Sequence, residues 1–118
     1  MKSINPATGK LIAEYPEHTT KEIEQIIAVA DKTFDSWKTT TFAQRRKLMK
    51  EAARVLRAEV ETYAELMSLE MGKIISESRA EVEKCAWVCD YYADNAENFL
   101  ADEIIETDAS KRDRKRVV

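Results

Sequence analysis

Apolar residues recur every three or four positions along most of the chain, which is the period of amphipathic helices. This pattern predicts helices over about residues 20–38, 43–71 and 76–100. The second stretch is long for a helix without an internal cap, so we expect a bend or break near residues 58–62 that divides it in two. The pattern therefore indicates a mostly α-helical chain.

Local signals mark two of the predicted helix ends. Thr19 and Glu22 have the spacing of a capping box, in which the hydroxyl accepts a backbone N–H and the carboxylate reaches back to the cap. Gly72 directly follows the last apolar position of the second stretch, as a left-handed residue that ends a helix does. Both signals support the predicted helices.

Two segments have the pattern of strands. Residues 3–15 predict a β-hairpin, because a turn sequence over residues 5–9 leads into alternating apolar and polar positions that end at Pro16. Residues 104–118 form a second predicted strand region, in which pairs of apolar residues flank a charged segment. The fold is thus expected to carry strands at both ends.

The apolar faces indicate which residues are buried. The first helix has one stripe, and the third helix has apolar residues on more than one side, which indicates burial on several sides. We expect Trp37 and Trp87 to be core anchors, and Cys85 and Cys89 to be reduced core thiols. The stripe of the first helix consists of Ile23, Ile26, Ile27, Ala30, Phe34 and Trp37. The third helix carries Val82, Cys85, Cys89, Tyr92, Ala96 and Phe99 on one face and Trp87, Val88 and Tyr91 on another.

Composition excludes several kinds of site. The 118 residues include two Gly, which cannot build a glycine-rich nucleotide loop, and one His and two Cys, which cannot supply a four-ligand zinc site unaided. No apolar run is long enough to span a bilayer, and the start lacks the apolar core of a signal peptide. We therefore expect a cytoplasmic protein without a membrane partner.

No residue has sequence neighbours that indicate a catalytic role. Cys85 and Cys89 lie in mid-helix without an activating base, and His18 has no nucleophile nearby in the sequence. The segment 111–116 is basic but contains no aromatic residue, which favours an edge strand over a nucleic-acid surface. We therefore assign no catalytic, cofactor-binding or metal-binding residue, and we expect no nucleic-acid partner.

Six local motifs follow one another along the chain. They are Ile4-Asn5-Pro6-Ala7-Thr8-Gly9-Lys10, Phe34-x-x-Trp37-Lys38, Arg45-Arg46 with Leu48, Ala52 and Leu56, Leu69-Glu70-Met71-Gly72-Lys73, Glu77-x-x-x-Glu81 and Cys89-Asp90-Tyr91-Tyr92-Ala93. In this order they resemble the N-terminal quarter of the NAD(P)-dependent aldehyde dehydrogenase superfamily. Within that superfamily the chain is most similar to bacterial succinate-semialdehyde dehydrogenases.

The resemblance implies a large α/β parent with a Rossmann-like cofactor domain, a catalytic domain and an oligomerisation arm. In this family a catalytic Cys attacks the aldehyde, hydride passes to NAD or NADP, and a Glu-activated water releases the acid. Neither Cys85 nor Cys89 matches the family's Gly-Gln-x-Cys context. As an N-terminal scaffold the 118-residue chain is therefore expected to be inactive and to bind no cofactor.

The resemblance also implies positions and partners. Tyr92, Asn95 and Phe99 are implied to lie near the substrate entrance. The expected partners are the rest of the same chain and sister subunits of a homo-oligomer. Two alternatives remain open from the residues alone, namely a stand-alone helical protein-interaction module and, more weakly, a nucleic-acid adaptor that uses residues 111–116.

Overall fold

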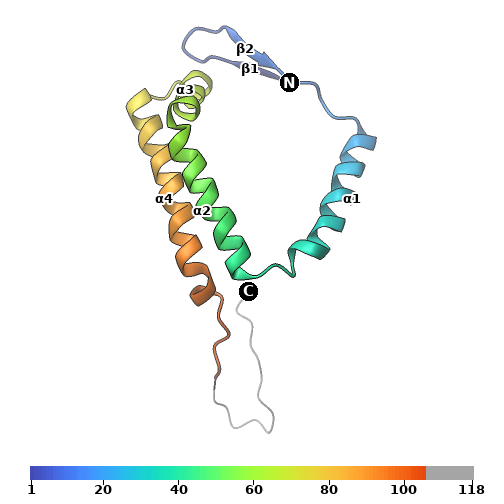
Figure 1. The fold of residues 1–118 in the computed structure, drawn as a ribbon. Coiled ribbons are helices and arrows are strands. Elements are labelled where there is room, and N and C mark those ends of the chain that lie inside the picture. The colour runs from blue at the N-terminus through green and yellow to red at the C-terminus, as the bar shows by residue number, and fades with distance from the viewer. Residues whose placement is uncertain (106–118) are drawn as a thin grey trace.

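The computed structural model describes residues 1–105, which form a two-stranded sheet followed by four helices (Figure 1). This arrangement confirms a mostly helical chain with an N-terminal β-hairpin. Residues 104 and 105 have no regular structure. The rest of the strand region predicted over 104–118 lies outside the described residues, as does the basic segment 111–116.

The hairpin pairs β1 (Lys2–Ile4) with β2 (Leu11–Glu14) in antiparallel register. Its turn is held by the Asn5 side chain, whose Oδ1 accepts hydrogen bonds from the backbone N–H groups of Ala7 at 2.9 Å and Thr8 at 3.1 Å. Gly9 supplies the positive φ of 68° that closes the turn. The turn chemistry expected from residues 5–9 is therefore present.

The helices are α1 (Thr20–Trp37), α2 (Phe42–Ala58), α3 (Val60–Met71) and α4 (Ile75–Phe99). The long second stretch breaks at Glu59, which has φ −110° and ψ 24°, inside the interval where a break was expected. A left-handed Gly72, with φ 68°, ends α3 as predicted. Among helices of residues 1–105, none has the length and apolar character needed to cross a membrane.

Two helix starts are closed by capping boxes. The box of Thr19 and Glu22 at α1 is confirmed, with the Glu22 N–H donating to Thr19 Oγ1 at 3.3 Å. A second box joins Thr41 and Gln44 at α2. The sequence analysis missed it, although a Thr followed three residues later by Gln carries the same signal.

The core lies where α4 runs antiparallel beside α2 and where α3 packs on the first half of α4 (Figure 1). Ser68 and Ser78 share a hydrogen bond of 3.0 Å between their hydroxyl oxygens, which satisfies the buried Ser78. The buried positions are occupied mainly by Ala and Ser, with larger side chains half-buried around them. The buried residues are Ala53, Ala64, Ser78, Val82, Ala86 and Ala93.

The expectation of aromatic and thiol core anchors is wrong for the described part of the chain. Trp37 is 45% exposed and Trp87 is 57% exposed. Cys85 is also exposed and Cys89 is half-buried, and both are free thiols. The positions that α4 buries against α2 and α3 are Ser78, Val82, Ala86 and Ala93, so Trp87 and Cys85 of the same helix lie on its other sides.

Helix α1 stands apart from this core. Each of its residues is exposed, although its apolar side chains form one stripe. In Figure 1 the hairpin bridges from α1 to the α3–α4 end of the bundle. The radius of gyration is 20.9 Å, whereas a compact domain of this length has about 13 Å. The chain is therefore open rather than globular.

Candidate functional site

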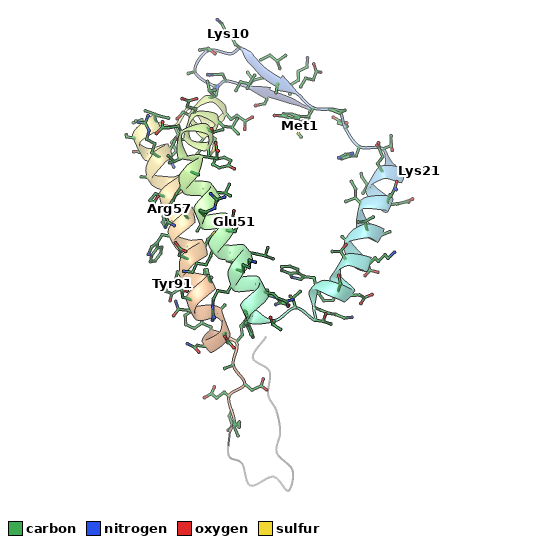
Figure 2. All side chains as sticks on the ribbon, viewed as in Figure 1. Met1, Lys10, Lys21, Glu51, Arg57 and Tyr91 are labelled. Carbon is green, nitrogen blue, oxygen red and sulfur yellow. The ribbon has the colours of Figure 1, made fainter. Side chains whose placement is uncertain are left out.

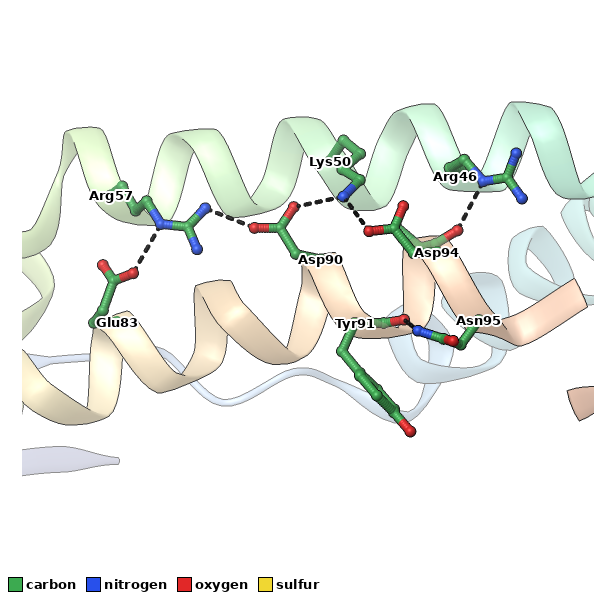
Figure 3. A network of polar contacts seen from close by, with 9 residues as sticks. Arg46, Lys50, Arg57, Glu83, Asp90, Tyr91, Asp94 and Asn95 are labelled. Atoms are coloured by element: carbon green, nitrogen blue, oxygen red, sulfur yellow. Dashed lines mark hydrogen bonds and ion pairs between the residues drawn. The ribbon is translucent and has the colours of Figure 1, made fainter. Parts of the chain in front are cut away.

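A row of ion pairs joins α2 to α4 along one side of their contact (Figure 3). The Arg57 guanidinium donates to Glu83 at 2.9 Å and to Asp90 at 2.8 Å. Lys50 Nζ lies 3.1 Å from Asp90 and 2.7 Å from Asp94. Cations of α2 thus alternate with carboxylates of α4, so each Asp90 oxygen has a partner.

Arg46 extends this ladder toward the C-terminal end of α4. Its Nη2 lies 3.2 Å from Glu97, and its Nε donates to the backbone carbonyl of Ala93 at 2.8 Å. Because that carbonyl belongs to the α4 backbone, the bond fixes the axial register of the two helices as well as their separation. We call the set Arg46, Lys50, Arg57, Glu83, Asp90, Asp94 and Glu97 the ladder.

The ion pairs of the ladder shift the pKa values of Asp90 and Lys50. Arg57 and Lys50 hold the pKa of the Asp90 carboxyl below its usual range by hydrogen bonding, and Asp94 and Asp90 raise the pKa of Lys50. Both groups are therefore firmly charged at neutral pH. A group that performs general acid–base work needs a pKa near the working pH, so the ladder is a structural feature and not a proton donor.

The ladder predicts a pH-dependent stability. A carboxylate whose folded pKa is depressed contributes stability above its unfolded pKa, and that contribution is lost as the pH falls through its folded pKa. We expect the urea midpoint of unfolding to be level near neutrality and to fall below about pH 4, the ordinary range of an Asp carboxyl.

The variant Asp90→Asn isolates this effect. It should lower the midpoint at pH 7, and its difference from the parent chain should shrink as the pH falls below about 4, because the contribution of the Asp90 carboxylate is lost as the pH approaches its lowered pKa. Asp31→Asn on the exposed α1 is the matched control, because Asp31 forms no ion pair within residues 1–105. Equal midpoint changes in the two variants at pH 7 would show that the ladder does not stabilise the fold.

The residues expected near a substrate entrance all lie along one flank of α4. Tyr92 is 50% exposed, Phe99 is 57% exposed, and Asn95 is half-buried with its amide nitrogen donating to the Tyr91 carbonyl at 2.8 Å. Figure 3 shows Asn95 next to Tyr91 on the side of α4 that faces away from α2. Spacings of three and four residues place Tyr92, Asn95 and Phe99 in one row. Their role at an entrance stays a prediction.

A hollow of about 310 Å³ opens beside this flank, between the start of α2 and the end of α4. Tyr92 lines it, whereas Asn95 and Phe99 do not. The polar side chains at its wall are Arg45, Arg46 and Glu97. Its apolar wall is formed by Trp37, Phe42, Leu48, Met49, Tyr92, Ala93, Ala96 and Leu100.

Arg45 is committed to structural contacts at this hollow. Its Nη2 donates to the Trp37 carbonyl at 3.1 Å, its Nε donates to Thr40 Oγ1 at 2.8 Å, and its guanidinium lies 5.4 Å from the Trp37 ring centroid. These contacts hold the loop between α1 and α2. The wall of the hollow contains no Ser, Thr, Cys or His, and its hydroxyl group is the phenol of Tyr92.

The described residues bring no catalytic constellation together. Cys85 and Cys89 lie in the middle of α4, and His18 is exposed with its Nδ1 4.0 Å from Glu22. Within residues 1–105, no three His, Cys, Asp or Glu side chains gather as metal ligands would. The site that the structure does build is the apolar flank of α4 with its adjoining hollow.

A dinucleotide cofactor does not fit these residues. Gly72 closes a helix against Pro6, so its backbone is not free to cradle a phosphate. A capping side chain engages one amide in the first turn of α1 and one in the first turn of α2, and Glu22 in α1 and Glu77 in α4 place a carboxylate in the first turn, which repels an anion. No step of a reaction is therefore derived through a cofactor on this part of the chain.

The ladder was not predicted from the sequence. The sequence does contain a pattern that indicates it. The cationic residues at positions 46, 50 and 57 have nearly the same spacing as the acidic residues at positions 97, 94, 90 and 83, read from the C-terminal end of α4 toward its N-terminal end. That arrangement is what an antiparallel helix pair requires. Recognising it needed the knowledge that these two helices are neighbours.

Comparisons with known proteins agree on one family. Residues 1–117 match the family model of the aldehyde dehydrogenase family. A probable succinate-semialdehyde dehydrogenase (NADP(+)) of Synechocystis sp. is 45% identical over 109 residues, which are 92% of this chain and 24% of that protein. A succinate-semialdehyde dehydrogenase (NADP(+)) of Mycobacterium leprae is 44% identical over 107 residues, 91% of this chain and 23% of that protein.

The fold also matches solved structures. The crystal structure of succinic semialdehyde dehydrogenase from Streptococcus pyogenes in complex with NADP+ superposes with a TM-score of 0.85 at 30% identity, over 91% of this chain and 24% of that chain. The chain thus spans about a quarter of the length of these relatives.

Proposed function

Since the chain belongs to the aldehyde dehydrogenase family, we propose that it serves as the N-terminal structural segment of an NAD(P)+-dependent enzyme that oxidises an aldehyde to a carboxylic acid. Succinate semialdehyde is the proposed substrate, because the relatives at 42–45% identity carry that name. The proposed enzyme is a cytoplasmic homo-oligomer, and the partners of this segment are the rest of its own chain and sister subunits.

One observation carries this proposal, namely the exposed apolar surface of a chain that matches about a quarter of each relative. Helix α1 buries none of its residues in the described structure, whereas most of the stability of a helix in a protein comes from packing of its apolar face. Faces of this kind mark contacts with another part of a protein. A structural segment of a larger enzyme accounts for them.

In this proposal other parts of the enzyme supply the catalytic residues and bind the cofactor. The nucleophilic thiol, the base and the hydride-accepting nicotinamide belong to residues outside the 118, because Cys85 and Cys89 lack the activating surroundings of a nucleophile. The contribution of this chain is to hold α4 in register through the ladder. Tyr92, Asn95 and Phe99 would then stand beside the path that the aldehyde takes.

A chimera tests the proposal. In the Synechocystis relative, the 109 matched residues are replaced by those of this chain, and NADP+ reduction with succinate semialdehyde is followed by absorbance. We expect the chimera to reduce NADP+ and the purified 118-residue chain to reduce none. A folded chimera without activity, or activity of the 118-residue chain alone, would contradict the proposal.

A second candidate is a stand-alone helical interaction module, which the apolar hollow beside α4 favours. It requires the 118-residue chain to unfold cooperatively and to form a defined monomer or dimer by itself. Circular dichroism in urea together with light scattering distinguishes the two. An aggregating chain without a cooperative transition excludes the module and agrees with a segment that needs its parent.

A further inference from the structure

Helix α1 is held at both ends, away from the bundle. At its N-terminal side, the hairpin is tied to the end of α3, where Ser3 Oγ donates to Glu70 at 2.6 Å and Pro6 lies against Gly72. At its C-terminal side, the Arg45 contacts fix Trp37 and the following loop. Contacts of the flanking segments thus accompany a position of α1 that is apart from α2 and α4 (Figure 2).

The exposed face of α1 is a continuous apolar stripe. Its members recur at three- and four-residue steps, and Phe34, in the last turn of α1, is 58% exposed. Polar residues such as Gln25 and Lys32 lie on the opposite side of the helix, about half a turn away. We call Ile23, Ile26, Ile27, Ala30, Phe34 and Trp37 the α1 stripe.

Helix α4 has a second, uncovered row beside the one that packs on α2 and α3. Its members are spaced by three and four residues, as in a helix that contacts two neighbours. Tyr92 and Phe99 in this row are exposed, and Tyr91 beside them contacts Tyr92 and Phe99 with ring centroids 5.4 and 6.0 Å away. We call Cys85, Val88, Tyr92, Asn95 and Phe99 the α4 seam.

The two surfaces meet at one place. Trp37 at the end of the α1 stripe and Tyr92 in the middle of the α4 seam line the same hollow of about 310 Å³. Leu48 and Met49 of α2 continue the apolar wall between them. The α1 stripe, the hollow and the α4 seam therefore form one connected apolar surface that lies on three helices.

We propose that this surface binds the remaining three quarters of an aldehyde dehydrogenase chain tightly enough to assemble without a covalent link. The inference rests on the proposed function and names the contact surface. The occupant is indicated by the family match, which leaves most of each relative's length unmatched, and by the position of α1 apart from α2 and α4, which leaves the surface open for a large body. A linker adds effective concentration but no contact, so separate pieces can form the same interface.

A split enzyme tests this. The 118-residue chain is co-expressed with the Synechocystis relative from which the matched residues have been removed, and the covalent chimera of the same two parts is prepared alongside. We expect the two pieces to co-purify in equal amounts, with NADP+ reduction within about tenfold of the chimera at saturating concentration of the 118-residue chain. An active chimera whose separate parts fail to co-purify overturns the inference and leaves the proposed function intact. An inactive chimera overturns both.

Matched variants locate the surface. Phe34→Asp places a charge in the α1 stripe, whereas Gln25→Asp places the same charge on the opposite face. We expect Phe34→Asp to weaken assembly by at least about tenfold and Gln25→Asp to leave it unchanged, because only the first loses apolar burial in the complex. Circular dichroism checks that both variants keep their helix content. Equal affinities would show that the pieces meet through another surface.

Discussion

Replacing Ala86 by leucine is expected to destabilise the chain by about 2–3 kcal/mol, because the larger side chain cannot fit between the helices of the core. Ala86 has no exposed surface, and it lines no hollow that could accept extra methyl groups. Leucine would have to push α4 away from its neighbours. That movement also lengthens the ion pairs of the ladder, which depend on the α2–α4 separation.

Urea unfolding followed by circular dichroism measures this change. Ala80→Leu on the exposed side of α4 is the control, since it adds the same atoms where there is space. Trp87→Ala is the second comparison: it removes the largest side chain of α4, yet we expect it to cost less than about 1 kcal/mol because that side chain is mostly exposed. A greater loss from Trp87→Ala than from Ala86→Leu would mean that Trp87 is part of the core.

These expectations differ from the sequence analysis, which predicted Trp87 to be a core anchor. The difference arises because a sequence pattern reports local structure and not which helices are neighbours. Periodicity identified every helix, and turn and capping residues located the hairpin, the end of α3 and the start of α1. These features depend on neighbours within about four positions. The break at Glu59 was likewise predicted from helix length without caps.

The packing could not be predicted in the same way. A helix with apolar residues on several sides does not reveal which side its nearest neighbour covers, and the analysis assigned the core to the larger residues of α4. The structure instead buries Ala86 and Ala93 and leaves Tyr92 and Phe99 outside. Large side chains that are exposed in the structure form the surface for which we propose a partner.

Replacing Gly72 by alanine is expected to cost about 2 kcal/mol, more than the same change at Gly9. Both glycines have φ 68°, a left-handed conformation that costs an alanine about 1 kcal/mol. Gly72 has a second constraint, because a Cβ atom built there lies 3.2 Å from Cγ of Pro6. A Cβ atom at Gly9 meets no described atom within 4 Å.

The difference between the two variants therefore measures how firmly the hairpin is docked on the α3–α4 turn. Urea unfolding gives the two stabilities, and hydrogen exchange of the Tyr15 amide, which donates to the Met1 carbonyl at 2.8 Å, reports the hairpin. In Gly72→Ala, Pro6 must shift by a few tenths of an ångström away from the new Cβ atom, and we expect the Ser3–Glu70 hydrogen bond of the same hairpin to weaken.

A double variant separates strain from contact. Adding Pro6→Ala to Gly72→Ala removes the opposing Cγ atom but leaves the left-handed backbone, so the cost of Gly72→Ala should fall toward that of Gly9→Ala. Equal costs at the two glycines, with no coupling to Pro6, would show that the hairpin is not held on the turn. Helix α1 would then lose its N-terminal anchor, and the open arrangement that exposes the α1 stripe would have no structural cause at that end.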